Sequence, residues 1–524
     1  MDAGQGTTGL LVGYGVAAIG IAAGFVATRA AVVRWLLLPV LAAPVALAGA
    51  ALWSLVLGAI PRLIPLLGPR AVVVGGGALT LAAGVLAGAL ARRPAPRIRV
   101  ERGTRIVDAP SAGRGARRAG TAPIVYAGQA VPALDETRHF KLIGTTGTGK
   151  STAIRGLLRA ALARGDRAVI ADPDGAYTAD FYEPPRGDLI LNPFDARSMR
   201  WDPFAELRES YDGDLLARAL IPDHGGEDRS WRSYARVFLS ACLRQLARAG
   251  CRDVGTLYHL VAIAPVEELR ALLATTAAGP YLSADNARFF ASVRAIATAQ
   301  LGFLEHLARP EGASAVSVRD WVRRSTAGAM FLPYRPSQVA TLCSVISTWM
   351  RLAIFEAMEL GEGDHRLWFV VDELDALGPI DGLKDALARL RKYGGRCVLA
   401  FQSIAQVSGA YGVADAQTIV ENCGNTLILR CSAAENGGTA RFASRLIGER
   451  EILREQISRV QGNFFDKQQR SRSVSLQHVI ESAVLPAEIE QLPDLCGYLK
   501  FASAGAWLRV QMGPDGGRGG ARSG

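Results

Sequence analysis

A glycine-rich turn lies between a short apolar run and an alanine-rich segment in the first third of this 524-residue sequence. It reads Gly144-Thr-Thr-Gly-Thr-Gly-Lys150-Ser151, after the apolar run 140–143 and before residues 151–164, whose alanines and leucines favour a helix. This is the Walker A spacing, GxxxxGK[ST], in its expected strand-turn-helix context. Because units of this kind belong to mainly parallel sheets flanked by helices, the sequence predicts an α/β fold.

Each position of this turn has a chemical reason. Glycines let successive backbone N–H groups curl around a β-phosphate, Lys150 reaches the β- and γ-oxygens, and the Ser151 hydroxyl is a ligand for Mg²⁺. We therefore expect ATP and Mg²⁺ as ligands. The residues predicted to bind the nucleotide are Gly144, Thr145, Thr146, Gly147, Thr148, Gly149, Lys150, Ser151 and Thr152.

A second apolar run, 367–371, ends in the paired carboxylates of Asp372 and Glu373. A hydrophobic strand that ends in two acids has the form of a Walker B motif, and the upstream phosphate loop favours this interpretation. Asp372 is predicted to hold Mg²⁺ together with Ser151. Glu373 is predicted to orient and deprotonate the attacking water, so these residues and Lys150 form the predicted catalytic centre.

Further polar positions are candidates for the same chemistry. Gln402 follows the predicted strand 397–401, which should end at the same sheet edge as the Walker B strand, and its amide suits reading the γ-phosphate or aligning the water. Arg391 ends a segment predicted to be helical from about Gly382. Its cation either caps that helix or reaches a neighbouring subunit's nucleotide as an arginine finger. Arg430 is a second candidate for the finger.

Alternating strand and helix patterns extend the α/β prediction over most of the chain. Predicted strands cover residues 140–143, 167–171, 326–332, 367–371, 397–401 and 426–429. Between 203 and 309 the pattern changes to helix-period segments at 215–219, 234–249, 254–262, 266–278 and 287–307. The predicted regions are a transmembrane anchor (1–93), a basic linker (94–122), a first nucleotide-binding part (123–202), an inserted all-α domain (203–310), a second nucleotide-binding part (311–511) and a disordered tail (512–524).

Stretches without charge near the N-terminus predict membrane helices. Residues 3–28, 35–61 and 71–91 are each long enough to cross a bilayer, which takes about 20 residues. An arginine cluster follows the last stretch and should lie on the cytoplasmic side, which would place the rest of the chain in the cytosol. Two spans with an interfacial helix are an alternative, because prolines interrupt the middle stretch. A cleaved signal peptide needs a basic start, whereas the only early charge is Asp2.

Charge and cysteine usage add little about function. The formal net charge is +11, and the arginine run after the membrane stretches accounts for much of it, so charge alone does not indicate nucleic-acid binding. The seven cysteines are scattered and contain no CxxC pair. They suggest neither a disulfide framework nor a zinc site.

The order of these motifs resembles the coupling ATPases of conjugation and type IV secretion, the TraD/TraG class of membrane-anchored DNA translocases. The resemblance covers nearly the whole chain, from the apolar N-terminal stretches to about residue 510. Besides the two Walker motifs, it rests on Ala171-Asp-Pro-Asp-Gly175, Leu191-Asn-Pro-Phe-Asp195, Trp201-Asp-Pro-Phe204, Ala400-Phe-Gln-Ser403 and Glu481-Ser-Ala-Val-Leu-Pro-Ala-Glu-Ile489.

The resemblance implies a RecA-like P-loop NTPase domain with an inserted all-α domain and a multi-pass anchor in the bacterial inner membrane. It implies a homo-hexamer that hydrolyses ATP between subunits in the cytoplasm and passes DNA, usually a relaxase-linked single strand, to a type IV secretion channel. Expected partners are DNA, relaxase and relaxosome proteins, and channel components. The family's motif order makes Arg391 the first choice for the arginine finger.

This sequence departs from the family in its apolar segments, which are three with short loops where many members have two spans around a periplasmic region. This departure concerns the part of the family that contacts the envelope channel. Some members also carry a long acidic C-terminal extension, whereas in this sequence only residues 512–524 follow the second nucleotide-binding part. Substrate choice would then come from the helical domain or an adaptor.

Two other functions stay open. A double-stranded DNA pump of the chromosome-segregation type is expected to carry a DNA-reading winged-helix module after residue 486, and none fits there. A secretion ATPase that recruits protein effectors without moving DNA is compatible with intact Lys150, Asp372 and Glu373. DNA-dependent ATP hydrolysis would separate these readings.

Overall fold

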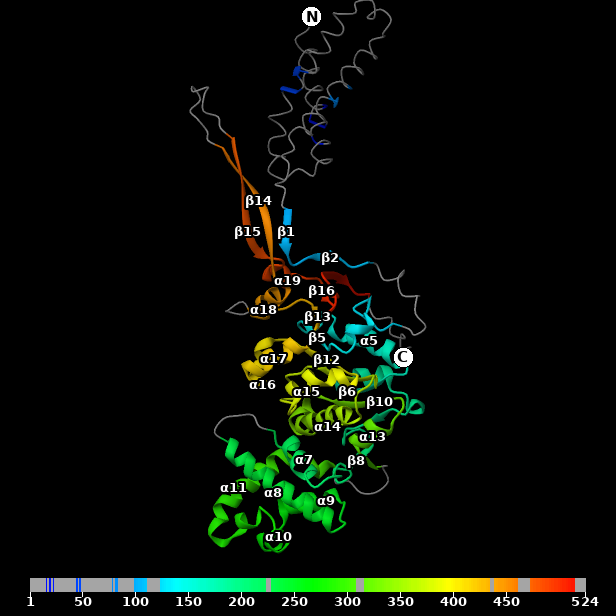
Figure 1. Ribbon diagram of the computed structural model, residues 1–524, viewed down its shortest axis with the longest axis vertical. Helices are drawn as coiled ribbons and strands as arrows, with labels where there is room; N and C mark the ends of the chain where they lie inside the picture. The colour runs from blue at the N-terminus through cyan, green and yellow to red at the C-terminus, as the bar shows by residue number, and fades with distance from the viewer. Residues whose placement is uncertain are drawn as a thin grey trace, which may run out of the picture. The chain divides into compact units, whose positions relative to one another are not determined.

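The computed structural model describes residues 99–110, 123–222, 228–307, 315–433, 438–459 and 472–513, with a few isolated positions before residue 99 (Figure 1). Apart from those isolated positions, the predicted membrane helices and most of the predicted tail lie outside the described residues. The chain divides into two compact units, Met1–Arg99 with Leu453–Val479, and Val100–Ile452 with Ile480–Gly524. The main sheet and its flanking helices belong to the second unit.

A ten-stranded sheet forms the centre of this second unit, with the order β2-β17-β16-β13-β5-β12-β11-β6-β10-β7. The seven strands from β13 to β7 run parallel to their neighbours, while β16 is antiparallel to both β13 and β17. The sheet is therefore mixed and mainly parallel. Its strands are β2 (Ile106–Asp108), β5 (Phe140–Ile143), β6 (Arg167–Pro173), β7 (Leu189–Ile190), β10 (Ala329–Tyr334), β11 (Leu367–Asp372), β12 (Gly395–Phe401), β13 (Asn425–Ile428), β16 (Cys496–Lys500) and β17 (Trp507–Gln511).

Each predicted strand has a counterpart in this sheet, and β5 has the predicted bounds. The largest displacement is in β10, which begins at Ala329 instead of residue 326. Gly328 adopts φ 98°, and a side chain there would come within 2.8 Å of the Gly187 carbonyl oxygen. The chain is therefore still in a tight turn at Gly328, packed against the turn at Gly187, and the strand begins at the next residue.

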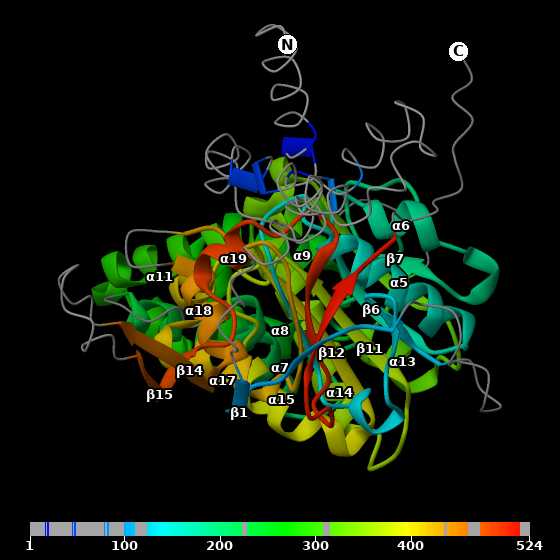
Figure 2. The ribbon, with the colours of Figure 1, turned by 90° about the horizontal axis from the view of Figure 1, so that it is seen from above.

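Helices cover both faces of the sheet (Figure 2). Successive residues of β11 enter opposite cores: Trp368 and Val370 join the cluster that contains α5, and Phe369 and Val371 join the cluster on the other face. This alternation explains why the strand is apolar at every position. The flanking helices are α5 (Lys150–Ala163), α6 (Ala176–Phe181), α13 (Val318–Arg324), α14 (Val339–Glu359), α15 (Leu383–Leu390), α16 (Ile404–Tyr411), α17 (Val413–Asn422), α18 (Gly438–Ile447) and α19 (Pro486–Glu490).

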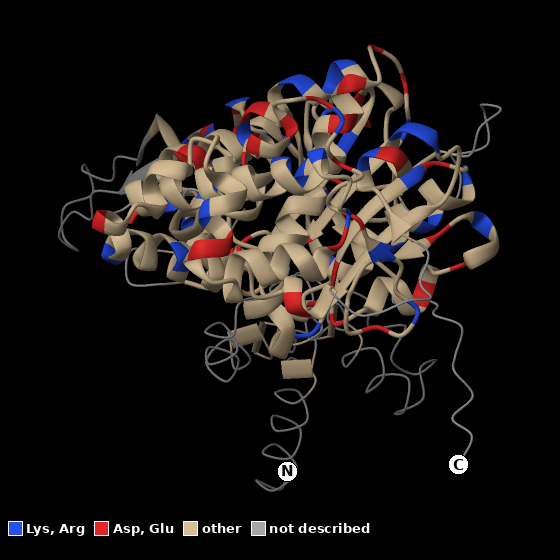
Figure 3. Ribbon diagram, turned by 90° about the horizontal axis from the view of Figure 1, so that it is seen from below, with Lys and Arg blue, Asp and Glu red and all other residues tan. Residues whose placement is uncertain are grey.

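Charged side chains lie mostly on the helices and loops around the sheet, and the central strands carry few of them (Figure 3). Among the described residues, only the helix over Pro336–Glu359 is long and apolar enough to cross a membrane. However, 61% of its most apolar window is buried inside the protein, where α14 packs on the sheet strands. This burial is typical of a helix in a protein core.

The described residues between β8 (Arg200–Trp201) and β9 (Ala315–Val316) form helices and turns without strands. The helix-period segment predicted over 287–307 forms two helices, because it is interrupted at Gly302, a poor helix former, and at Phe303, which is buried. The core residues of this segment share one cluster with a face of the sheet, and its independence as a domain stays a prediction. Its helices are α7 (Asp212–Leu220), α8 (Arg229–Arg248), α9 (Val254–Tyr258), α10 (Val266–Leu273), α11 (Ala287–Leu301) and α12 (Leu304–Leu307).

Part of the predicted linker is strand, so the prediction for residues 99–108 needs correction. β2 pairs with β17, and β1 (Arg99–Gly103) pairs with β14 (Glu449–Arg459), which also pairs with β15 (Arg472–Ser482). Thr104 N–H donates to the Glu449 carbonyl at 2.9 Å. These strands depend on partners several hundred residues away, so their own short sequences carry little strand signal. A small hairpin, β3 (Val125–Tyr126) and β4 (Gln129–Ala130), follows.

Candidate active site

The phosphate loop joins the carboxyl end of β5 to the start of α5 and needs glycine in two left-handed positions. Gly147 has φ 78° and Gly149 has φ 113°. A Cβ atom on Gly149 would also lie 2.8 Å from Cδ2 of Leu495. A side chain at position 149 is therefore excluded by both backbone conformation and space, and the loop can present backbone N–H groups instead.

Neighbouring strands hold the base of this loop. Gly144 N–H donates to the Phe401 carbonyl at the end of β12, at 3.3 Å, and Thr145 N–H donates to the Arg430 carbonyl after β13, at 2.9 Å. β5 lies between β12 and β13 in the sheet. The loop is thus fixed at the carboxyl edge of three parallel strands, the edge at which open α/β sheets bind ligands.

Lys150 lies beneath the loop and is mostly buried. Its Nζ atom donates to the carbonyl oxygens of Gly144, at 2.8 Å, and Thr145, at 3.1 Å. Burial lowers the pKa of Lys150, while the nearby carboxylates of Asp372 and Glu373 act in the opposite direction. The ammonium is therefore held at the cavity by the loop's own carbonyl groups.

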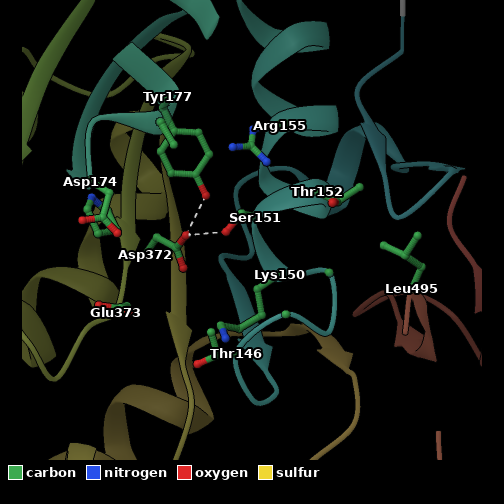
Figure 4. Close-up of a pocket in the computed structure, with 14 residues that line it drawn as sticks. Thr146, Lys150, Ser151, Thr152, Arg155, Asp174, Tyr177, Asp372, Glu373 and Leu495 are labelled. Atoms are coloured by element: carbon green, nitrogen blue, oxygen red, sulfur yellow. Dashed lines mark hydrogen bonds between the residues drawn. The ribbon is translucent and has the colours of Figure 1, made fainter. Parts of the chain in front are cut away.

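Ser151 and Asp372 meet across the site (Figure 4). The Ser151 hydroxyl donates to Oδ2 of Asp372 at 3.1 Å, and the Tyr177 hydroxyl donates to the same oxygen at 2.7 Å. Burial, and then the nearby Asp372 carboxylate, raise the pKa of Tyr177 well above its usual range, so this phenol stays a donor. Hydroxyl and carboxylate oxygens are the ligands that Mg²⁺ prefers, so the donor set fits the predicted ion.

Glu373 follows β11 in a left-handed backbone conformation, with φ 75°, which is costly for a non-glycine residue. Its carboxylate accepts a hydrogen bond from Nε2 of Gln402 at 3.1 Å, and Oε1 of Gln402 accepts one from the Thr146 hydroxyl at 3.0 Å. Burial, and then the like charge of Asp372, raise the pKa of Glu373. The phosphate loop, the amide and the carboxylate therefore form one hydrogen-bonded chain.

These groups surround a cavity of about 360 Å³. The carboxylates of Asp372 and Glu373 line it, and Gln402 reaches it through Thr146 and Glu373. Gly144, Thr145 and Thr148 lie in the loop itself and not among the residues that line the cavity. The predicted nucleotide-binding residues that line it are Thr146, Gly147, Gly149, Lys150, Ser151 and Thr152.

Known proteins share both the sequence and the fold that carry this site. A family model for the DNA-binding domain of type IV secretion-system coupling proteins matches residues 123–513. The chain belongs to this family of coupling proteins. The resemblance stated from the motifs is thereby confirmed.

Individual relatives agree with the family. The coupling protein TraD of Escherichia coli K12 is 30% identical over 372 residues, which cover 70% of this chain and 51% of TraD. This coupling protein thus spans about half the length of TraD. VirD4 of Bartonella henselae is 31% identical over 141 residues, 26% of this chain and 21% of VirD4.

Solved structures of another coupling protein, TrwB, are similar over most of the chain. Unbound TrwBdeltaN70 is 33% identical with a TM-score of 0.69, and the match covers 79% of this chain and 94% of that one. TrwB in complex with ADP and Mg²⁺ is 32% identical with a TM-score of 0.67, with the same coverage.

Arg391 lies away from the cavity of its own subunit in this coupling protein. It is the exposed C-cap residue of α15 and begins the turn Arg391–Tyr393 that leads into β12. Gln402 follows the other end of that seven-residue strand, which spans about 20 Å. The helix-cap position agrees with the simpler of the two interpretations of Arg391, and its role as an arginine finger stays a prediction.

Arg430, the second finger candidate, lies beside the phosphate loop of its own chain. Its backbone carbonyl holds Thr145, and its guanidinium bonds to Oδ1 of Asp494 at 2.6 Å and to the Leu492 carbonyl at 3.3 Å. Arg430 therefore links the turn before β16, through Leu492 and Asp494, to the phosphate loop. A role for Arg430 at a neighbouring subunit is a prediction that these contacts do not test.

Six residues that line the cavity of this coupling protein were not among the predicted site residues: Arg155, Pro173, Asp174, Ala176, Tyr177 and Leu495. Tyr177 follows the Asp-Pro-Asp-Gly motif that the resemblance had singled out, so that motif was the available signal. Leu495 has φ 63° and its N–H donates to the Thr148 carbonyl at 2.9 Å. No local pattern marks Leu495, because its position depends on the antiparallel strands at the far end of the chain.

Proposed function

We propose that this chain is the ATP-driven motor of a DNA-transfer coupling protein. The observation that carries the proposal is the single cavity at which the phosphate loop, the Ser151–Asp372 pair and the Glu373–Gln402 pair converge. TrwB, solved with ADP and Mg²⁺ and with ATP and GTP analogues, supports ATP and Mg²⁺ as the ligands of this site.

Loop backbone N–H groups and Lys150 bind the phosphates in this proposal. Nζ of Lys150 now bonds to two backbone carbonyls, which are weaker acceptors than phosphate oxygens, so the ammonium can turn towards the γ-phosphate. Ser151 and Asp372 would hold Mg²⁺ through their oxygen atoms. When bound, Mg²⁺ neutralises charge on the β- and γ-phosphate oxygens.

Glu373 acts as the general base for hydrolysis. Its raised pKa makes the carboxylate a stronger base than an ordinary glutamate, and the Gln402 hydrogen bond fixes its direction. Gln402 also contacts Thr146 of the phosphate loop, so the amide is placed to respond to the γ-phosphate. Water attacks the γ-phosphorus as Glu373 takes its proton, and ADP leaves.

The oligomeric state, location and partners of the motor are inferred from the family and not from the cavity. The proposed protein is a homo-hexamer in the bacterial inner membrane, with several N-terminal spans and a cytoplasmic ATPase. It recruits relaxase-bound, single-stranded DNA and moves it to a type IV secretion channel. Arg391 completes a neighbouring subunit's site, where an arginine finger contributes about 10³ to 10⁵ in rate in related chemistry.

The substrate class is tested by ATP hydrolysis of the full chain in detergent, with single-stranded DNA, with duplex DNA and without DNA. Stimulation mainly by single strands is the expected result. Stimulation by duplex alone would indicate a double-stranded DNA pump. Equal hydrolysis under all conditions, by assembled protein, would contradict a DNA motor and favour a protein-secretion ATPase.

A further inference from the structure

Tyr177 joins the Walker B carboxylate to a helix that the Walker motifs do not include. Its hydroxyl donates to Oδ2 of Asp372 at 2.7 Å, and Tyr177 lines the cavity together with Ser151 (Figure 4). Ser151 donates to the same oxygen at 3.1 Å. Neither bond uses Oδ1, so both donors set the direction of the carboxylate from one side.

The position of Tyr177 is fixed from the sheet by Asp172. This fully buried carboxylate at the end of β6 accepts the backbone N–H of Tyr177 at 3.0 Å. It also accepts the N–H and the hydroxyl of Thr178, each at 2.6 Å. Asp174 and Gly175 turn the chain with φ 60° and 70°. The Asp-Pro-Asp-Gly motif thus aims Tyr177 at the neighbouring strand β11.

A second attachment connects Tyr177 to the helix of the phosphate loop. Arg155 of α5 lies over the Tyr177 ring, 5.7 Å from its centroid, and its Nε atom donates to Oδ2 of Asp180 at 2.7 Å. The Tyr177 side chain is nearly fully buried. Because the ring is packed and held from two elements, its hydroxyl has little freedom to leave Asp372.

We propose that Tyr177 is a positioning residue for the Mg²⁺ site, which holds the Asp372 carboxylate in its metal-binding direction through the Asp172-capped turn. The inference rests on the proposed function, because it concerns the metal of the same ATP site. Tyr177 contacts Asp372 directly and would act on the metal only through that carboxylate. The Asp-Pro-Asp-Gly motif thereby gains a role that the phosphate-binding chemistry does not give it.

The physical reason is that the two donors to Asp372, Ser151 and Tyr177, differ in their relation to the metal. Ser151 would be a ligand of Mg²⁺, so its hydrogen bond to Asp372 would weaken or change direction when the metal is bound. Tyr177 would not be a ligand, so its hydrogen bond to Asp372 can stay and keep the carboxylate oriented. Groups that hydrogen-bond to metal ligands typically change metal affinity by about 10- to 100-fold when removed.

Tyr177→Phe tests the inference because it removes the hydroxyl and keeps the ring. The measurement is binding of a fluorescent ADP analogue to the full chain during a MgCl₂ titration. The Mg²⁺ concentration at half saturation should rise about 10-fold or more. Tyr126→Phe is the matched control: Tyr126 is equally buried, lies outside the cavity, and its hydroxyl has no partner among the described residues.

A structural role for Tyr177 gives a different result. Loss of α6 packing would weaken nucleotide binding in EDTA as well as in Mg²⁺, whereas the inference predicts unchanged affinity in EDTA. An unchanged Mg²⁺ requirement in a folded Tyr177→Phe protein would overturn the inference. Wild-type protein that binds no nucleotide in either condition would instead overturn the proposed function.

Two further variants keep the inference testable if Tyr177→Phe does not fold. Asp172→Asn keeps the Tyr177 hydroxyl but weakens the hydrogen bonds that anchor its turn, so the Mg²⁺ concentration at half saturation should also rise. In an Asp372→Ala background, Tyr177→Phe should change the Mg²⁺ requirement by less than about twofold, because the two residues act as one unit. Full, additive effects in the double variant would contradict action through Asp372.

Discussion

Gln402 donates a hydrogen bond from its side-chain amide to the carboxylate of Glu373, at 3.1 Å, across two neighbouring parallel strands. The strand register explains this meeting. Asp372 pairs with Ala400, so Glu373 and Gln402 follow the ends of β11 and β12 at nearly the same level. The water-activating carboxylate and the amide that contacts the phosphate loop are therefore placed by the sheet itself.

This relationship makes Gln402→Ala a test of the amide. The change removes both the bond to Glu373 and the bond from Thr146, while the residues that hold the phosphates and Mg²⁺ stay intact. We expect ATP turnover to fall by about 10- to 100-fold, the equivalent of about 1–3 kcal/mol, with nucleotide affinity nearly unchanged. A loss of affinity equal to the loss of turnover would show that Gln402 serves binding instead.

Glu373→Gln should separate binding from hydrolysis. The amide keeps the size of the side chain but cannot accept the water's proton, so turnover should fall by about 10² to 10⁴ while ATP still binds. In the wild type, turnover should decrease as pH falls through the raised pKa of Glu373, because protonation removes the base. This acid limb should begin above the pH range of an ordinary glutamate and disappear in the variant. Wild-type turnover in Glu373→Gln would remove its proposed role.

Two glycines of the same region should respond in opposite ways to alanine. Gly149→Ala places a Cβ 2.8 Å from Leu495 at φ 113°, so we expect a loss of about 1–3 kcal/mol of stability and loss of nucleotide binding. Gly156→Ala adds a Cβ inside α5 with nothing within 4 Å, and should gain about 1 kcal/mol from helix propensity. Urea unfolding of the full chain measures both. Equal effects of the two substitutions would contradict the described loop.

Mixed assembly tests Arg391 at a neighbouring subunit. Arg391→Ala subunits keep an intact phosphate loop, and Lys150→Ala subunits keep the arginine, so mixing the two inactive proteins should restore part of the ATP hydrolysis. Lys392→Ala, a change to the exposed neighbour, is the matched control and should retain activity alone. Absence of complementation in proven mixed oligomers would count against the finger, as would full activity of Arg391→Ala by itself.

The local sequence was sufficient to predict the site residues that meet at the carboxyl edge of the sheet. Lys150, Asp372 and Gln402 each follow an apolar run, and parallel strands bring such positions together whatever their distance in the sequence. The order of motifs along the sequence does not show at which edge of the sheet Arg391 lies. A helix that connects two parallel strands returns to the start of the next one, so a residue just before β12 lies at the opposite edge from Gln402.

Long-range pairing accounts for what the sequence did not indicate. β2 lies in a stretch rich in arginine, proline and glycine, and it becomes a strand only because β17 presents a free edge about 400 residues later. Leu495 reaches the phosphate loop through the same antiparallel end of the sheet. Tyr177 was adjacent to a recognised motif, but its contact with Asp372 requires the pairing of β6 with β11.

ATP hydrolysis in this cavity is tested most directly by phosphate release from the purified full chain with Mg²⁺ and single-stranded DNA, beside Lys150→Ala. We expect turnover in the wild type and a loss to background in the variant, because Lys150 would hold the β- and γ-phosphates. Equal turnover by the two proteins would contradict the assignment of this site.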